Sequence, residues 1–418
     1  MFSILPIGNL GKGKSQRTAV RMAAAMAGLS LLAPVTAFAQ CTDNFNYFAT
    51  ISGVDRPVQS LLPLGSGSSL AVLTSTINTV NSAFLASSSA FVSAPGGAKP
   101  DERGNGMWMR GIAGSVETNT SSVGVLQPSV VTPSPTGTQN CKTSIKQTYE
   151  GFQLGYDIAV LNRGGSGANW HFGITGGQLA ANLKDRTPGS SYSGFTVAGG
   201  QLEQNTQVPY VGLYSTYTQK GFFVDGMVRW DFYRNTFTDP GNGVTSQTGF
   251  DGRGFAVLGN MGQTFALRDG WFVEPSGGMM YSKVSIDPIN VTGFSSVYAT
   301  GVVTVNDIES LMGRFTLRVG RNLTVGNYAY QPFFSAGVYH EFLGNVSATS
   351  LEQGSTTTAI NGLKMTTTSK DGLGTYGQFS LGTAVVLPNN ITTFVRGDYR
   401  TGEHIESWGI NGGVRFNF

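Results

Sequence analysis

Hydrophobic and polar residues alternate along much of this chain at the two-residue period of a β-strand, in twelve separate runs. Each run has the ~9–11 residues that a tilted strand needs to cross a membrane, or somewhat more. A closed membrane barrel requires this alternation, because one face of each strand contacts lipid and the other faces a wet lumen. The predicted strands are 107–116, 149–160, 170–181, 208–218, 221–236, 252–268, 271–284, 310–322, 330–343, 373–387, 390–400 and 408–418.

The connections between these runs alternate between short and long. Short turns, such as Arg268-Asp269-Gly270, follow the even-numbered runs. Short turns at one rim and long loops at the other are typical of outer-membrane barrels, whose short turns are periplasmic. We therefore predict an all-β membrane fold, a twelve-stranded antiparallel transmembrane β-barrel. The long connections, rich in Thr, Ser, Gly and Asn, are 117–148, 182–207, 285–309 and 344–372.

The last run ends the chain on an aromatic residue. Its apolar face carries Trp408, Ile410, Val414, Phe416 and Phe418, and its other face is mostly polar. Two aromatics in the last three positions would leave a soluble edge strand prone to aggregation, whereas a strand of a closed barrel has neighbours on both sides. The alternative is an ordinary sandwich strand at a chain end.

Charged residues repeatedly share the parity that must face the lumen, because a charge on the lipid face near the midplane costs ~2–4 kcal/mol. We favour the interpretation that these arginines pair with nearby carboxylates and stiffen the wall. The alternative is a lumen biased toward anions. The predicted lumen charges are Arg229, Asp231, Glu274, Arg314, Arg318, Arg396, Asp398, Arg400 and Arg415.

Composition agrees with a barrel. Charged residues make up 12% of the chain, 58 residues are Gly, and the mean hydropathy is -0.03. This hydropathy excludes a helical membrane protein but not a barrel, in which apolar and polar positions cancel. The net charge of +3 is too small to indicate a nucleic-acid partner.

Residues 1–39 are predicted to be a secretory signal peptide. A basic segment precedes the apolar run Met22–Leu32, and Ala37-Phe38-Ala39 provides a small-x-small site for cleavage between Ala39 and Gln40. The apolar run is too short for a transmembrane anchor. Lipidation of Cys41 is disfavoured, because Gln40 occupies a position where lipoprotein processing requires a small residue.

A helix is predicted over 68–90, where apolar residues recur at intervals of three and four. Its length suits a membrane thickness, and its many Ser, Thr and Asn residues suit a narrow water-filled lumen rather than lipid. The alternative is a periplasmic or surface helix. The remaining segments are a short exposed tail at 40–67, a linker at 91–106 and the barrel itself at 107–418.

The order of signal peptide, helix, linker and twelve strands ending in an aromatic resembles the C-terminal translocator domain of autotransporters (type V secretion). Local strings similar to that family include Trp108-Met109-Arg110-Gly111, GFQLGYD at 151–157 and Phe272-Val273-Glu274-Pro275. The resemblance implies a helix that plugs the barrel and joins it to an exported passenger. The passenger would be unusually short here, because 40–67 cannot bury a core by itself.

Three functions follow as hypotheses. The first is a non-enzymatic outer-membrane protein of a Gram-negative bacterium that anchors or translocates its short N-terminal segment and exposes long loops. The second is a channel with a plug helix, and the third is a barrel-embedded hydrolase, for which His171, His340 and His404 are the candidate bases. Asn78 and Asn81 are similar to asparagines at which some autotransporters cleave themselves, although in this helix they are more simply polar surface.

The expected partners are outer-membrane lipid, an unknown host or surface ligand and, by the resemblance, the barrel-assembly machinery, which would read the terminal strand. No cofactor, metal or catalytic residue is assigned. A disulfide is predicted between Cys41 and Cys141, the only cysteines of the chain, because export is oxidising and a descending helix would leave both residues on the outer side. Free thiols or an intermolecular bond remain alternatives.

Overall fold

The computed structural model describes most of the chain after the predicted signal peptide. Residues 38–418 form one compact unit. The signal peptide, its cleavage pair Ala39 and Gln40, and 91–98 of the predicted linker lie outside the described residues. The described ranges are 41–45, 48–51, 54–57, 67–85, 99–127, 137–187, 190–192, 195–197, 200–240, 244–292, 300–326, 328–353, 364–369, 372–387 and 391–418.

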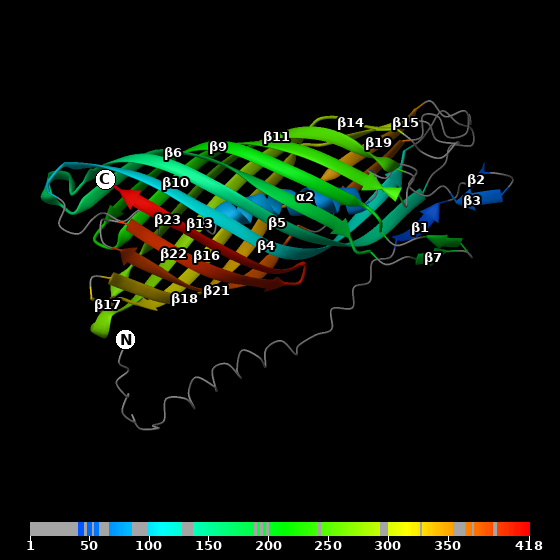
Figure 1. The fold of residues 1–418 in the computed structure, drawn as a ribbon. Helices are drawn as coiled ribbons and strands as arrows, with labels where there is room; N and C mark the ends of the chain where they lie inside the picture. The colour runs from blue at the N-terminus through cyan, green and yellow to red at the C-terminus, as the bar shows by residue number, and fades with distance from the viewer. Residues whose placement is uncertain are drawn as a thin grey trace, which may run out of the picture. The chain divides into compact units, whose positions relative to one another are not determined.

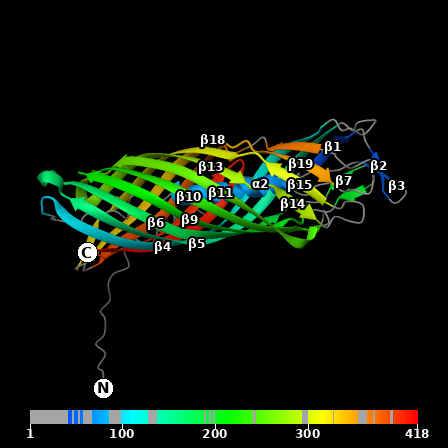
Figure 2. The same cartoon turned by 90° about the horizontal axis from the view of Figure 1, so that it is seen from above.

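Twelve long antiparallel strands form a closed barrel, as the alternating pattern predicted. Each strand pairs with the next along the chain, and the last strand pairs with the first from Ile405 opposite Thr118 to Asn417 opposite Gly106. The tilted strands surround the helix α2 (Gly67–Leu85) (Figures 1 and 2). They are β4 (Glu102–Leu126), β5 (Gly137–Leu161), β6 (Ala168–Asp185), β9 (Glu203–Gln219), β10 (Phe222–Asp239), β11 (Val244–Gln263), β13 (Trp271–Ile286), β16 (Ile308–Arg321), β18 (Tyr328–Leu343), β21 (Thr375–Leu387), β22 (Ile391–Gly402) and β23 (Ile405–Asn417).

The short turns use residues in left-handed conformations. Lys220 and Gly221 both have positive φ (48° and 85°), the arrangement of a two-residue turn whose twist matches its strands. At the next short turn, Asp269 and Gly270 have φ of 57° and 77°. These turns lie at one end of the barrel, which we call the short-turn end. Small elements nearby are β12 (Phe265–Ala266), β17 (Leu323–Val325) and the 3-10 helices η4 (Arg163–Gly165) and η6 (Arg268–Gly270).

The opposite, long-connection end differs from the prediction. The segment 117–148 was expected to be a loop, but β4 continues to Leu126 and β5 begins at Gly137. The connections 285–309 and 344–372 were also expected to be loops, yet they contain strands that pair in the order β14–β15–β19–β20–β4. These segments are rich in Thr and Val, whose branched side chains suit strands. Their bounds are β14 (Ile289–Thr292), β15 (Thr300–Val305), β19 (Ser347–Gln353) and β20 (Lys364–Ser369).

Other short strands complete the described structure. β1 (Cys41–Phe45) pairs with β5, so the tail adds a strand beside the barrel wall. β2 (Phe48–Ile51) pairs with β3 (Val54–Pro57), and β7 (Ser190–Tyr192) pairs with β8 (Phe195–Val197) within the connection predicted at 182–207. The linker prediction also ended too late, since β4 begins at Glu102, which pairs with Leu161.

The polarity of the wall reverses along its length, and β6 shows this within one strand. Near the short turns, Phe172 and Ile174 are exposed on the outer face, while His171 is buried inside. Toward the long connections, Leu179 and Leu183 of that same inner face are buried, and the outward residues become polar. The part of the barrel with an apolar outer belt has the polarity of a membrane protein. The part beyond it has an apolar interior, like a soluble domain.

The helix α2 (Gly67–Leu85) lies inside the barrel, in the half nearer β14, β15 and β19 (Figures 1 and 2). It covers most of the predicted helix 68–90, of which residues 86–90 lie outside the described residues. Within the described ranges, no helix combines the length and the apolar character needed to cross a membrane.

Candidate functional site in the lumen

The half of the lumen nearer the long-connection end, here the outer half, is a hydrophobic core around α2. Every residue from Leu70 to Ser82 is buried, and Leu70, Ile77 and Val80 belong to one apolar cluster with wall residues such as Ile145 and Met312. The prediction of a water-filled passage around the helix was therefore wrong for this half. The alternation of residues along the strands located the inward face correctly but not its polarity. Beyond the lipid belt, nothing requires the inward face to be polar.

Several polar side chains of α2 form hydrogen bonds with the wall within this core. The hydroxyls of Ser75 and Thr79 both donate to Oε1 of Gln147, at 2.8 and 3.1 Å. Asn81 donates to the hydroxyl of Ser282 at 2.7 Å, and Asn78 donates to the buried carboxylate of Glu341 at 3.4 Å. Pairing of this kind lets the Ser, Thr and Asn residues of the helix enter an apolar core without a large desolvation penalty.

Two arginines on different walls contact the last turns of α2. Arg229 of β10 donates to Oδ1 of Asn81 at 3.3 Å, and Arg400 of β22 donates to the hydroxyl of Ser82 at 2.7 Å. Cations near a helix C-terminus interact favourably with its unsatisfied carbonyls and dipole. Arg229 also contacts Asp231 at 2.6 Å, so its charge is compensated within the wall. These contacts mark the boundary between the apolar outer half and the charged inner half.

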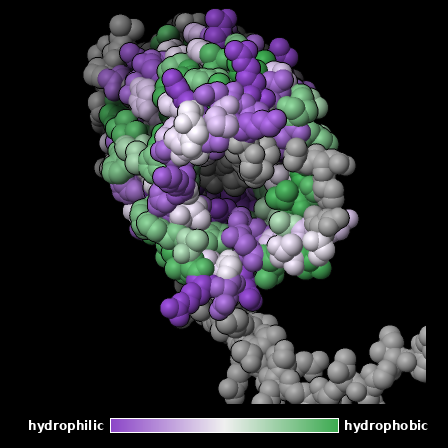
Figure 3. Space-filling model, turned by 90° about the vertical axis from the view of Figure 1, so that its left-hand side faces the viewer, coloured by the Kyte–Doolittle hydropathy of each residue, from purple (hydrophilic) through white to green (hydrophobic). Residues whose placement is uncertain are grey.

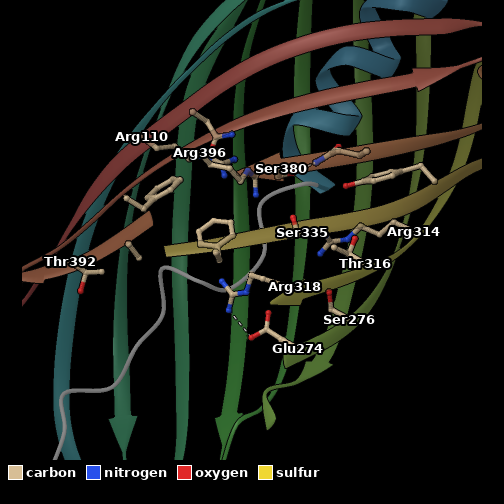
Figure 4. Close-up of a pocket in the computed structure, with 16 residues that line it drawn as sticks. Arg110, Glu274, Ser276, Arg314, Thr316, Arg318, Ser335, Ser380, Thr392 and Arg396 are labelled. Atoms are coloured by element: carbon tan, nitrogen blue, oxygen red, sulfur yellow. Dashed lines mark hydrogen bonds and ion pairs between the residues drawn. The ribbon is translucent and has the colours of Figure 1, made fainter. Parts of the chain in front are cut away.

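The inner half of the lumen, toward the short-turn end, is lined by charged and polar side chains (Figure 4). Arg318 contacts Glu274 at 2.7 Å. Arg396 contacts Asp398 at 2.9 Å, while Arg314 donates to the amide oxygen of Asn260. Viewed from that end, hydrophilic side chains surround a hollow (Figure 3).

A buried cluster joins the last strand to the first hairpin. Arg415 of β23 reaches across β4 and forms two hydrogen bonds with Asp157 of β5, both at 2.8 Å. Asp157 also contacts Nδ1 of His171 at 3.0 Å and accepts the Tyr214 hydroxyl at 2.7 Å. The arginine passes directly over Gly106, where any side chain would collide with it. We call Asp157, His171, Tyr214 and Arg415 the closing-seam cluster.

Comparison with known proteins identifies the family. The autotransporter beta-domain model matches residues 135–398. The chain belongs to this family. It is 29% identical over 278 residues to the pertactin autotransporter of Bordetella parapertussis, covering 65% of this chain and 26% of that protein. It is also 24% identical over 237 residues to the probable autotransporter YcgV of Escherichia coli K12, covering 55% and 22% respectively. The chain thus spans about a quarter of the length of these relatives.

Two solved autotransporter structures share the fold. The beta domain of Bordetella BrkA has a TM-score of 0.50 and 20% identity, covering 75% of this chain and 98% of that one. The transport unit of AIDA-I from Escherichia coli has a TM-score of 0.52 and 15% identity, covering 83% and 97%. The family places the protein in the outer membrane of a Gram-negative bacterium, where its exposed apolar belt contacts lipid.

The terminal strand of this autotransporter barrel presents its apolar side chains outward. Trp408, Ile410 and Phe418 are 60%, 51% and 66% exposed, and Val414 and Phe416 are partly exposed. Arg415 on the opposite face is 1% exposed. The strand therefore has one face for lipid and one for the closing-seam cluster.

The two cysteines are directly opposite each other in neighbouring strands. Cys41 of β1 is the register partner of Cys141 of β5, far from it in sequence. Directly opposed residues of antiparallel strands have Cα atoms about 4.5–5.5 Å apart, a separation that suits a disulfide. The pairing also places the tail at the long-connection end of the wall.

The three histidines that were candidate bases are dispersed. His171 is buried in the closing-seam cluster, His340 contacts the Thr375 hydroxyl at 2.7 Å, and His404 lies between β22 and β23. Across the described residues, no three His, Cys, Asp or Glu side chains gather as metal ligands would.

Sequence reasoning missed several lumen residues. Asp157, Gln147 and Glu341 were not singled out, although all three have inward parity in strands that were predicted or extended from predicted ones. Asp157 and Arg415 are 258 positions apart, so only the closed ring brings them together. The parity of Asp157 was the available signal.

Proposed function

We propose that this protein is an autotransporter-type anchor: its barrel translocates the segment 40–67 and then retains α2 in the lumen, which leaves that segment at the cell surface. The long connections would be exposed on the same side, and the protein would not be an enzyme. The observation that carries the proposal is the packing of α2, whose residues 70–82 are buried and contact walls on different sides of the barrel.

The direction of the helix supports this topology. The helix contacts β20 at the long-connection end, and its last turns contact the charged boundary farther inside. β4 then starts at Glu102 at the short-turn end. The tail and the start of β4 are thus at opposite ends of the barrel. If the short turns are periplasmic, the tail is outside.

The two alternatives are less well supported. A channel would require α2 to leave an apolar core, which exposes buried Leu and Ile side chains and costs free energy. A hydrolase would require a base near a nucleophile, whereas His171 has a structural set of partners and no Ser, Cys or Thr nucleophile is among the contacts described for it.

The topology is tested by an epitope inserted directly after Gln40. Antibody should label intact cells carrying this variant. A matched epitope in the Lys220–Gly221 turn at the opposite end should be labelled only after permeabilisation. Labelling of the first epitope only in permeabilised cells would overturn the proposed orientation.

The barrel-assembly machinery is the proposed partner during insertion, through the outward aromatic face of β23. Replacing Phe416 and Phe418 together with Ser should abolish the heat-modifiable migration of a closed barrel in membranes. The control for lost apolar area is the same pair of substitutions at Phe152 of β5 and Phe172 of β6, both of which are exposed on the outer face. Equal loss in both variants would argue against a special role of the terminal strand.

We also propose the Cys41–Cys141 disulfide, which would hold the tail against β5. On the chain-entropy model, closing so long a loop contributes ~4–5 kcal/mol. Mass spectrometry after non-reducing digestion should find the two peptides linked. Unlinked peptides from the mature protein would refute the bond.

A further inference from the structure

Three cations follow one another around the outside of the barrel at the upper limit of the lipid belt. Arg234 of β10, Arg253 of β11 and Lys283 of β13 are all exposed on the outward face of adjacent strands. We call these three residues the basic arc. Directly below them, toward the short-turn end, the outward residues of the same strands are apolar and exposed.

The strand register fixes the arrangement. Phe232 lies opposite Arg253, and Phe255 lies opposite Lys283, so each cation of the basic arc is a diagonal neighbour of the next. Trp230 and Phe255 form the aromatic surface beneath, with ring centroids 5.7 Å apart. Aromatic residues of this kind are typical of the interface between hydrocarbon and headgroups. The basic arc is therefore at headgroup level.

The charges of the basic arc are unequally compensated. Lys283 contacts Asp307 at 2.9 Å and Glu309 at 3.3 Å. Hydrogen bonds from the Ser285 hydroxyl and then from the Lys283 ammonium lower the pKa of Asp307. Among the described residues, the structure gives neither Arg234 nor Arg253 an ion pair. The exposed Asp251 lies directly opposite Arg234. Because the structure gives neither arginine an ion pair with it, the two adjacent guanidinium groups keep hydrogen-bond donors for an anion.

The other side of the same rim carries a different set of charges. Glu117 of β4 lies directly opposite Glu406 of β23, and both are exposed outward, with Glu150 exposed on β5. Like charges in opposed positions are unfavourable. Lys146 of β5, which is also exposed, lies opposite Glu117 on its other side, so this part of the rim carries charges of both signs and no adjacent pair of exposed arginines.

We propose that Arg234 and Arg253, assisted by Lys283, bind the phosphate groups of a phosphorylated glycolipid in the outer leaflet. Arginine presents a planar fork of donors that matches phosphate oxygens. The acyl chains of such a lipid would lie along Trp230, Phe232 and Phe255, directly below the phosphate. A lipid anion is favoured over free phosphate, because the aromatic surface is continuous with the lipid-facing belt.

The test uses the mature protein in detergent with bisphosphorylated lipid A, and retained lipid is measured by native mass spectrometry. The variant R234Q/R253Q should bind roughly tenfold or more weakly, as expected for two charges at an anionic surface. The matched control R163Q removes an exposed arginine at the short-turn end and should bind as the wild type does. Heat-modifiable migration confirms that each variant is folded.

Two further arms use other probes. Lipid A stripped of its phosphates should be retained by the wild type no better than by R234Q/R253Q. Inorganic phosphate alone should leave no bound adduct at the same concentration. Three results would each overturn the proposal. They are equal retention of lipid A by the wild type and R234Q/R253Q, retention of the stripped lipid by the wild type as strong as that of intact lipid A, and tight binding of inorganic phosphate.

Discussion

The two halves of the lumen are stabilised by different interactions, although the same strands form both. Around α2 the wall contributes buried apolar side chains, and the helix completes a core such as a soluble domain has. Toward the short turns the same inner faces carry arginines and carboxylates. The difference follows from what lies outside each half: where the outer face must be apolar for lipid, the inner face holds the polar residues, and where water surrounds the wall, apolar residues move inside.

In the charged half, substitutions should lower the unfolding free energy most where the charged side chains are fully buried. Replacing Asp157 with Asn leaves Arg415 buried without its counter-charge, which should cost ~3–5 kcal/mol of unfolding free energy. Urea unfolding in detergent measures this. The control Glu203→Gln makes the same change in an exposed pair with Lys184 and should cost no more than ~1 kcal/mol.

A second variant separates charge from packing in the closing-seam cluster. The double substitution D157N with Arg415→Met removes both charges, and it should recover much of the loss, because no buried charge is then left alone. A double variant as unstable as D157N would show that the strand joint depends on packing rather than on the ion pair.

The apolar half should respond to lost volume. Ile77→Ala leaves a cavity between α2 and the wall and should cost roughly 2–4 kcal/mol, with faster hydrogen exchange confined first to the helix. The matched variant Ile77→Val removes one methyl and should cost ~0.5–1.5 kcal/mol. Equal, negligible effects of both would mean that α2 is not packed in a dry core.

The boundary between the halves should tolerate the loss of one hydrogen bond. In Ser82→Ala, Arg400 loses its contact with the helix but keeps Gln378 at 2.9 Å and can be hydrated from the polar half. The expected loss is therefore ~1 kcal/mol or less by the same unfolding measurement. A loss above ~3 kcal/mol would place this site in the dry half instead.

The sequence predicted the membrane part of the barrel well, because lipid imposes one rule on every strand. Runs such as 221–236 alternate strongly, and the structure has β10 at Phe222–Asp239. The part beyond the lipid was missed for the opposite reason. In β6, Leu179 and Leu183 share the inward parity of His171, so the apolar face changes sides and the periodic signal weakens at that point.

The candidate site was only partly predictable. The inward arginines followed from parity, but their partners depend on closure of the ring, as the Arg415–Asp157 contact shows. The helix was recognised from its apolar spacing. Its dry surroundings could not be inferred, since the residues that pack against Leu70 and Ile77 come from strands that were expected to be loops or to line a wet passage.

The claim that α2 closes the outer half of the lumen is tested most directly by ion conductance in planar bilayers. The mature wild-type protein should pass no steady current, because an apolar core surrounds the helix. A variant lacking 67–85 that still migrates as a folded barrel should conduct steadily, with a preference for anions set by the remaining arginines. Steady conductance by the wild type, equal to that of the deletion variant, would contradict the account.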